Sequence, residues 1–302
     1  MKTKIPVTLS LICVTTSALA DIANYQSTIS SQSPAYYFNF DNSLSSAGNT
    51  ATFTANGTAG FGADYSGNAN GAASFPAASD YLSLSSTIIS GQGTATAVGS
   101  LSLLFYVPAT IPTTGYYFSD GETTGGAANG QPANSAFAFQ ISSSAGALTL
   151  KVANVSITGL PNVTADTWYY LGITYDLNGT TTDINGVNWY LGAIDGSLSS
   201  GFKQKGGSGN INSTGTLGDG LGFIAGNKQA AITVAPPGSS TAGVAGGAID
   251  ELATWDTALS ADQIQAQFNA LTTAVPEPSS EILVGIGALL LVQLRRKIPR
   301  HS

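Results

Sequence analysis

Short runs in which apolar and polar residues alternate recur along the chain, separated by stretches rich in Gly, Ser and Asn. Alternation over four to eight residues is typical of β-strands that bury one face. The pattern therefore predicts an all-β protein whose antiparallel strands form a sandwich of two sheets. The clearest runs are 33–41, 71–75, 80–84, 100–107, 148–152, 167–175, 187–194 and 246–255.

The strongest pair of predicted strands lies within residues 167–196. The first, TWYYLGITY, has largely aromatic or apolar side chains on both faces, which is typical of a mid-sheet strand that is covered on both sides. The second, at 187–194, alternates with Val, Trp, Leu and Ala on one face. Two Asn-Gly pairs lie between them, and such pairs favour tight turns. These residues predict a central antiparallel hairpin.

A closing strand at 246–255 is followed by a predicted short C-terminal helix. Ser260 suits the residue before the helix, and Gln263 stands three positions later, which is the spacing of a capping box. Apolar residues then recur at helical spacing and predict one buried face. That face holds Ile264, Phe268 and Leu271.

Residues 1–20 differ from the rest of the chain. Two lysines precede a short apolar run, and a small-x-small tripeptide ends at Ala20. This order predicts a secretory signal peptide that is cleaved after Ala20, with an apolar helix too short to span a bilayer permanently. The mature protein is then expected to begin near Asp21, and residues 21–274 to form one β-domain.

Residues 275–302 form a second segment of distinct composition. Pro276, Glu277 and Pro278 open it, an apolar run follows at 282–294, and basic residues end it. The run predicts a short apolar helix, below the roughly 20 residues of a stable membrane span. Basic residues behind it are typical of an end held in the cytoplasm. The segment reads as a sorting tail, with an ordinary single-helix anchor as the alternative.

Charge narrows the possible partners. Residues 21–274 contain four basic and 15 acidic residues and no Arg. A body this acidic cannot neutralise a phosphate backbone, so no nucleic acid partner is expected. Cations and neutral glycans remain compatible with it. The single cysteine, Cys13, lies in the leader, so the body has no disulfide or thiol chemistry.

The residues also argue against an enzyme. The only histidine, His301, lies outside the body, which leaves a Ser-His-Asp or Cys-His mechanism without its base. Glycosidases need two clustered carboxylates, and Glu122 and Glu251 are the only glutamates of the body. We predict a protein without catalytic activity. An aspartate pair assembled in three dimensions would instead give a cryptic glycan hydrolase.

Three segments together resemble laminin G-like domains, which belong to the concanavalin A-like lectin/glucanase jelly rolls. They are the opening strand SPAYYFNFD at 33–41, the central hairpin at 167–196, and the closing GAIDELATW with ALSADQI from Gly247 onward. Phe105 stands where many members have a tryptophan. The resemblance covers residues 33–271 and implies a concanavalin A-like jelly-roll sandwich.

The resemblance also implies a structural calcium ion, which takes six to eight hard oxygen ligands. Asp41 ends the first strand and Asp250 lies on the last, and these strands are neighbours in the family's topology. We expect the two aspartates to form the metal pair. The alternative is that Asp41 caps a turn and Asp250 hydrogen-bonds a loop. Asp80 and Asp195 are weaker candidates, expected in turns.

Aromatic residues are the candidates for stacking on sugars. The strand positions of the three tryptophans favour core packing instead. Tyr116 and Tyr117, next to a Gly/Ala/Asn-rich loop at 120–135, are the preferred candidates for a glycan-binding face. The tryptophans are Trp168, Trp189 and Trp255.

The tail, with its Pro-Glu-Pro, short apolar helix and basic end, resembles the PEP-CTERM sorting signal of Gram-negative bacteria. That resemblance implies an exosortase as processing partner, transient inner-membrane anchoring through the helix, and export to the cell surface or an extracellular polysaccharide matrix. The expected function is a secreted, surface-sorted binding or adhesion module that associates with glycan or exopolysaccharide. A structural matrix protein without a specific ligand is the first alternative.

Overall fold

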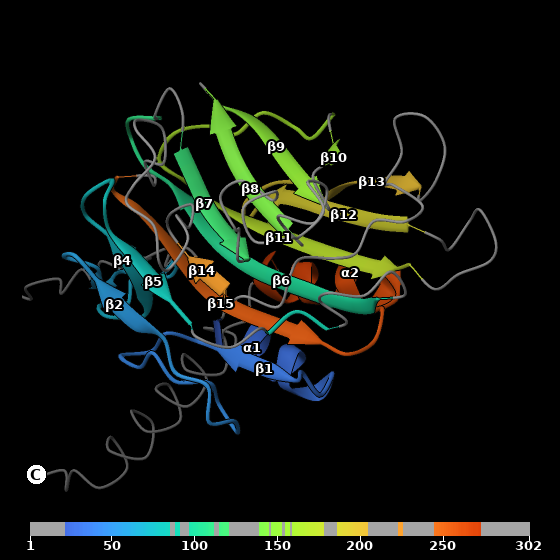
Figure 1. Cartoon of the computed structure of the whole chain (residues 1–302), viewed down its shortest axis with the longest axis horizontal. Coiled ribbons are helices and arrows are strands. Elements are labelled where there is room, and N and C mark those ends of the chain that lie inside the picture. The colour runs from blue at the N-terminus through green and yellow to red at the C-terminus, as the bar shows by residue number, and fades with distance from the viewer. Residues whose placement is uncertain are drawn as a thin grey trace, which may run out of the picture.

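The regular elements of the described part of the chain are mostly antiparallel β-strands, with one short helix near each of its ends (Figure 1). The two helices are α1 (Ile22–Ser31) and α2 (Ala261–Thr272). The computed structural model describes residues 22–84, 88–90, 97–111, 115–120, 139–144, 146–152, 155–157, 159–177, 186–204, 223–225 and 245–272.

The larger sheet has eight strands in the order β13-β12-β11-β6-β15-β4-β3, with β1 also paired to β15. The predicted central hairpin is confirmed, because β11 pairs with β12 and lies mid-sheet beside β6. The opening and closing strands were also predicted to be neighbours, and this is confirmed, because β1 pairs with β15. The bounds are β1 (Tyr36–Phe38), β3 (Gly60–Gly62), β4 (Ala72–Phe75), β6 (Val98–Val107), β11 (Thr167–Asp176), β12 (Gly186–Ala193), β13 (Ser199–Gln204) and β15 (Gly247–Trp255).

The second sheet has seven strands in the order β10-β9-β8-β7-β14-β5-β2, and every pairing described in it is antiparallel. The strands are β2 (Thr54–Asn56), β5 (Tyr81–Ser83), β7 (Gly115–Asp120), β8 (Phe139–Ser144), β9 (Ala147–Val152), β10 (Val155–Ile157) and β14 (Phe223–Ala225).

The main hydrophobic core lies between the two sheets. Alternate residues of β11 point into it, among them Leu171 and Ile173, and they meet Leu148 and Leu150 of the opposite sheet. Tyr170 of the same strand is buried in the separate outer cluster, which confirms the predicted two-sided burial of β11. The inner contacts are those of two antiparallel sheets that pack face to face.

Both helices cover the outer face of the eight-stranded sheet, away from β7, β8 and β9 (Figure 1). The predicted C-terminal helix is confirmed, and its cap is reciprocal. Ser260 Oγ accepts from the Gln263 N–H at 3.2 Å, and Gln263 Oε1 accepts from the Ser260 N–H at 2.9 Å. Ile264, Phe268 and Leu271 are buried against Leu104, Tyr170 and other residues of the outer face.

Helix α1 was not predicted. Its buried residues Tyr25 and Ile29 are spaced for one helical face, but a single helical face in ten residues is a weak sequence signal. The helix is stabilised by tertiary packing, since Tyr25 meets the ring of Tyr170 edge-on at 6.5 Å.

The predicted leader at 1–20 and tail at 275–302 lie outside the described residues, so the apolar helices expected within them stay predictions. Within the described ranges, no helix is both long and apolar enough to cross a membrane.

Candidate functional site

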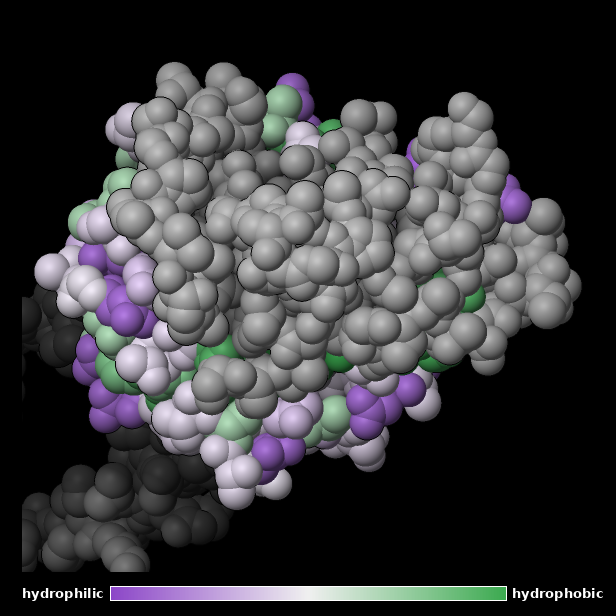
Figure 2. Space-filling view, viewed as in Figure 1, coloured by the Kyte–Doolittle hydropathy of each residue, from purple (hydrophilic) through white to green (hydrophobic). Residues whose placement is uncertain are grey.

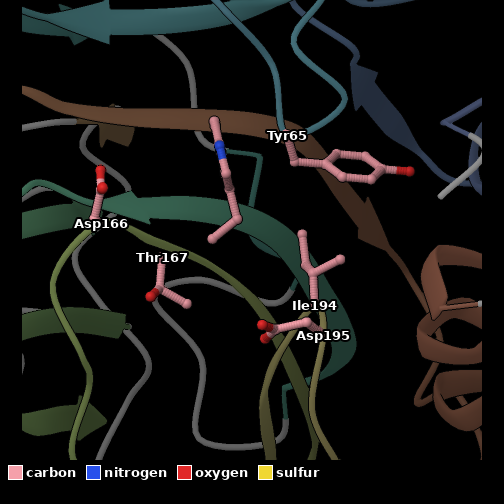
Figure 3. Close-up of a pocket in the computed structure, with 6 residues that line it drawn as sticks. Tyr65, Asp166, Thr167, Ile194 and Asp195 are labelled. Carbon is pink, nitrogen blue, oxygen red and sulfur yellow. The ribbon is translucent and has the colours of Figure 1, made fainter. Parts of the chain in front are cut away.

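A hollow of about 210 Å³ lies on the outer side of the eight-stranded sheet, where β11 begins and β12 ends (Figure 3). Three partly buried residues of its lining, Tyr65, Trp168 and Ile194, also pack against the outer hydrophobic cluster. Asp166 and Asp195 lie on different sides of it (Figure 3). The lining consists of Tyr65, Asp166, Thr167, Trp168, Ile194 and Asp195.

Trp168 is held by its strand neighbour. It lies opposite Tyr106 in the register of β11 and β6, and the two rings are 5.5 Å apart at an interplanar angle of 43°. The carbonyl of Trp168 accepts the N–H of Ile194 at 3.1 Å, which joins the two ends of the hairpin at the hollow. Trp168 is partly exposed, so part of its aromatic surface is available to a ligand.

Asp166 is fixed at the edge of the hollow just before β11. It has a φ of 58°, a left-handed conformation that aspartate tolerates better than most residues. The Tyr106 hydroxyl donates to Asp166 Oδ1, and this bond is the first cause of a raised pKa for Tyr106. The carboxylate is otherwise exposed and can accept hydrogen bonds from a ligand.

Tyr65 is carried by a loop that folds around a buried carboxylate. Asp64 Oδ1 accepts the N–H groups of Ser66 and Asn68, each at 2.8 Å, and its Oδ2 accepts the Asn68 amide at 2.8 Å. Gly71 lies against this carboxylate, because an added Cβ would be 2.8 Å from Asp64 Oδ2. The loop therefore positions Tyr65, which lines the hollow, packs against the outer hydrophobic cluster and has a buried hydroxyl.

Asp195 lies in the turn that follows β12. The N–H of Gly196 donates to the Ala193 carbonyl at 2.9 Å and closes that turn. The sequence expectation that Asp195 occupies a turn is therefore confirmed. Its exposed carboxylate contributes the second negative charge of the hollow.

Two adjacent carboxylates are buried beneath α1, at Asp250 and Glu251 of β15, and both are 0 % exposed. The pairing of β15 with β6 shifts at this point, and Glu251 has a φ of 53°. At this β-bulge both neighbouring side chains are buried beneath α1, whereas strict alternation would place one of them on each face of the sheet. Burial raises the pKa of Asp250, and the charge of Glu251 raises it further.

Glu251 is surrounded by donors. The Tyr37 hydroxyl donates to Glu251 Oε2, and Gln26 Nε2 donates to Glu251 Oε1 at 2.8 Å. These bonds lower the pKa of Glu251, but burial outweighs them and raises it from 4.5 to about 8. Nearby negative charges, Asp41 first and then Asp64, add to the rise.

Asp41 and Asp250, the predicted metal pair, interact electrostatically: the charge of Asp41 contributes to the raised pKa of Asp250. Asp41 itself is exposed, and its Oδ2 accepts from Gln26 at 3.0 Å and from Asn39 at 2.7 Å. Asp250 Oδ1 accepts the Glu251 N–H at 2.8 Å, while the buried Oδ2 has no hydrogen-bond partner.

These residues fit a calcium ion in part. The open Asp250 Oδ2 is the kind of hard acceptor that calcium takes, and backbone carbonyls and water can complete such a shell. The described residues do not, however, contain a group of three or more Asp, Glu, His or Cys side chains arranged around one point. The expected Asp41–Asp250 pair therefore stays a prediction.

The other sequence candidates have different outcomes. Trp189 and Trp255 are 7 % and 1 % exposed, which confirms core packing for these two. Tyr117 was expected on a glycan-binding face, and this was wrong. It is 2 % exposed, because β7 turns its ring into the inter-sheet core, 4.7 Å from the ring of Phe105. The side chain of Tyr116 lies outside the described residues.

Asp80 also has a structural role, as expected. Its carboxylate accepts from the Thr58 N–H at 2.8 Å, the Thr58 hydroxyl at 2.6 Å and the Ala77 N–H at 2.7 Å. The Thr58 bonds are the main cause of its lowered pKa. Asp80 therefore connects two loops through hydrogen bonds. These bonds occupy its carboxylate and indicate a structural role for it.

Sequence reasoning missed Tyr65 and Asp166. Asp166 directly precedes β11, whose second residue is Trp168, and this order is a local signal for an aromatic and a carboxylate at one strand end. Tyr65 gives no such signal, since its loop is about 100 residues away and reaches the hollow only through the tertiary structure.

Comparisons with known proteins bear on the fold. No protein-family model matches the sequence, and no curated protein matches it. Among solved structures, the botulinum neurotoxin serotype D binding domain is similar with a TM-score of 0.51 at 12% identity, covering 80% of this chain and 52% of that one. The serotype D ligand-binding domain in complex with N-acetylneuraminic acid gives a TM-score of 0.50 at 10% identity, covering 80% and 52%.

A third structure is described as showing that cell entry of botulinum neurotoxin type C depends on two ganglioside molecules. It gives a TM-score of 0.50 at 12% identity, covering 82% of this chain and 53% of that one. The chain thus spans about half the length of these domains. At such low identity the likeness shows a shared β-sandwich fold.

Proposed function

We propose that this chain is an exported carbohydrate-binding module of laminin G-like, jelly-roll type, and that it binds glycan in the hollow at the start of β11. The observation that carries the proposal is the composition of that hollow. Two aromatic residues that are each partly exposed, Tyr65 and Trp168, line it together with two exposed acidic residues, Asp166 and Asp195. Rings stack on the apolar faces of sugars, while carboxylates accept their hydroxyl hydrogens.

The surroundings of the hollow support binding by a rigid surface. Trp168 rests on Tyr106, Tyr106 donates to Asp166, and a closed turn holds Asp195. A site whose side chains are already held loses little conformational freedom when a ligand arrives. Figure 2 shows another side of the molecule, where the described residues at the rim are mostly hydrophilic or pale, with hydrophobic ones in small areas between them.

The similar solved structures add a weaker argument. Two of them are described with N-acetylneuraminic acid or with gangliosides, so glycan recognition occurs in proteins that share this fold. Function depends on the site and not on the fold, so the test must address the hollow itself.

A glycan array followed by titration calorimetry tests the proposal. We expect one or more glycans to bind the purified full chain. Trp168→Ala should weaken that binding at least tenfold, about 1.4 kcal/mol. Phe202→Ala is the matched control, because Phe202 is an aromatic residue of β13, 42 % exposed and absent from the lining. Equal binding by the Trp168 variant and the original chain would contradict the proposal.

A purely structural matrix protein predicts that no glycan binds at all. A glycan hydrolase predicts the release of reducing ends, lost in both Asp166→Asn and Asp195→Asn, because two carboxylates of one cleft would share the reaction. Binding is favoured over hydrolysis because both carboxylates are exposed to water, without the apolar setting that an acid catalyst needs.

Export and sorting belong to the same proposal. The leader that ends at Ala20 would direct secretion, and the tail with Pro276, Glu277 and Pro278 would be cut by an exosortase after transient anchoring in the inner membrane. The mature protein would then reside at the surface or in the polysaccharide matrix of a Gram-negative bacterium. Mass spectrometry of the secreted protein tests this directly: both termini should be shortened, and an intact tail would contradict the sorting step.

A structural calcium ion near Asp41 and Asp250 completes the proposal. The buried, unpartnered Asp250 Oδ2 supports it. Above pH 8, where Glu251 ionises, a bound cation would also offset its negative charge, for which the described residues offer no nearby basic side chain. The only described basic residues, Lys151 and Lys203, lie on β9 and β13.

A further inference from the structure

The charge of the hollow sets a limit on what it can bind. Asp166 and Asp195 both line it, and none of the described residues of its lining is basic. Of the two basic residues in the described part of the chain, Lys151 lies in the other sheet. Lys203 pairs with Val187, at the opposite end of β12 from Ile194. The field in the hollow is therefore negative, within a body that is itself acidic.

The aromatic residues act in the same direction as the carboxylates. The faces of Trp168 and Tyr65 carry negative quadrupole charge and attract a cation placed over the ring. The hydroxyl of Tyr65 adds no charge of its own. Burial raises its pKa, and the charges of Glu251, Asp64 and Asp250 raise it further, so the hydroxyl stays neutral. Rings and carboxylates together suit a ligand that has both an apolar sugar face and a positive charge.

We propose that the hollow selects glycans that carry a free amine, such as polymers of partly or fully de-N-acetylated hexosamine, over neutral and acidic ones. This inference rests on the proposed function and names its ligand class. The protonated amine pairs with the carboxylates of Asp166 and Asp195 while the pyranose ring stacks on Trp168. A sialylated glycan, with its own carboxylate, would be repelled, in contrast to the similar solved domain that holds N-acetylneuraminic acid.

Four probes separate the possibilities: a glucosamine hexamer, the N-acetylglucosamine hexamer, cellohexaose and sialyllactose. Each is titrated into the purified full chain at pH 6, where the glucosamine amine is protonated. The glucosamine hexamer is expected to bind roughly tenfold tighter than its acetylated counterpart. Asp166→Asn and Asp195→Asn should each remove about twofold to fivefold of that preference, which is the range of exposed charge pairs. Raising the salt concentration should reduce it as well.

Non-specific attraction to an acidic protein needs its own control. Asp256→Asn makes the same change of charge at an exposed position. Asp256 lies at the opposite end of β6 from the hollow. Its neighbour Trp255 pairs with Ser100 near the start of β6, whereas Thr167 of the hollow pairs with Val107 at the end of β6. The preference for the amine should survive in this variant. Loss of the preference there, to the same extent as in the Asp166 and Asp195 variants, would overturn the inference.

The outcomes also separate this inference from the proposed function. If neutral or acetylated hexamers bind as tightly as the amine form, and Trp168→Ala abolishes that binding, the glycan site stands and the choice of an amine is wrong. If the glucosamine hexamer binds but Trp168→Ala leaves its affinity unchanged, the hollow is not the site and both proposals fail. Tight binding of sialyllactose would overturn the charge argument directly.

Discussion

Replacing Glu251 by Gln should make the protein more stable at alkaline pH, although Glu251 is completely buried and hydrogen-bonded. Glutamine keeps the shape of the side chain, and its amide can still pair with Tyr37 and Gln26, since a tyrosine hydroxyl both donates and accepts. The change removes only the ionisable group. It therefore isolates the cost of holding a carboxyl group in this environment.

The magnitude follows from the raised pKa. In the folded protein the pKa of Glu251 lies at about 8, compared with 4.5 for an ordinary glutamate. A group with a raised pKa contributes its full stability below pH 4.5, and the contribution is lost as pH rises through 8. The difference corresponds to a loss on the order of 5 kcal/mol across this window. Asp250, whose pKa is also raised by burial and by Glu251, adds a loss of the same sign.

The assay is urea unfolding of the full chain at pH 5 to 9 in the presence of EDTA. The original chain should lose stability steadily over this range, by up to about 1.4 kcal/mol per pH unit for each titrating carboxyl. The slope of Glu251→Gln should be smaller by about that amount near pH 6 to 7. Asp256→Asn, an exposed change of the same charge, should keep the original slope.

Two results would refute this reasoning. Stability that stays constant or rises between pH 5 and 8 in EDTA would mean that the buried pair does not hold its protons. An unchanged slope in Glu251→Gln would mean that another group is responsible for the pH dependence.

Three further predictions concern stability. Calcium should raise the melting temperature above pH 8 in the original chain and not in Asp250→Asn, because the ion would replace the proton on a buried carboxylate; an unchanged melting temperature would remove the calcium proposal. Phe268→Ala should cost about 3–5 kcal/mol in urea unfolding, since Phe268 is buried against the ring of Tyr170; a loss below 1 kcal/mol would show that α2 is not needed to cover the sheet. Ser260→Ala should cost about 0.5–2 kcal/mol by removing the cap, and Ser260→Thr should keep most of it.

The local pattern of the sequence determined the secondary structure of the best-formed elements. Strict alternation identified β12, the two apolar faces of β11 identified a mid-sheet strand, and the Ser260–Gln263 spacing identified the start of α2. Each of these features depends on neighbours within about eight residues, so it can be read from the chain directly. The acidic, histidine-free body likewise limited the chemistry without any structure.

Tertiary structure decided which side chains could meet a ligand. Three tryptophans have similar strand contexts, yet Trp189 and Trp255 are buried by the opposite sheet and by the helices, while Trp168 at a strand end remains partly exposed. The bulge that buries Glu251 beside Asp250 has no local signature, because it depends on the register with β6. Burial, exposure and charge proximity arise from segments far apart in the chain, and alternation within one strand does not carry that information.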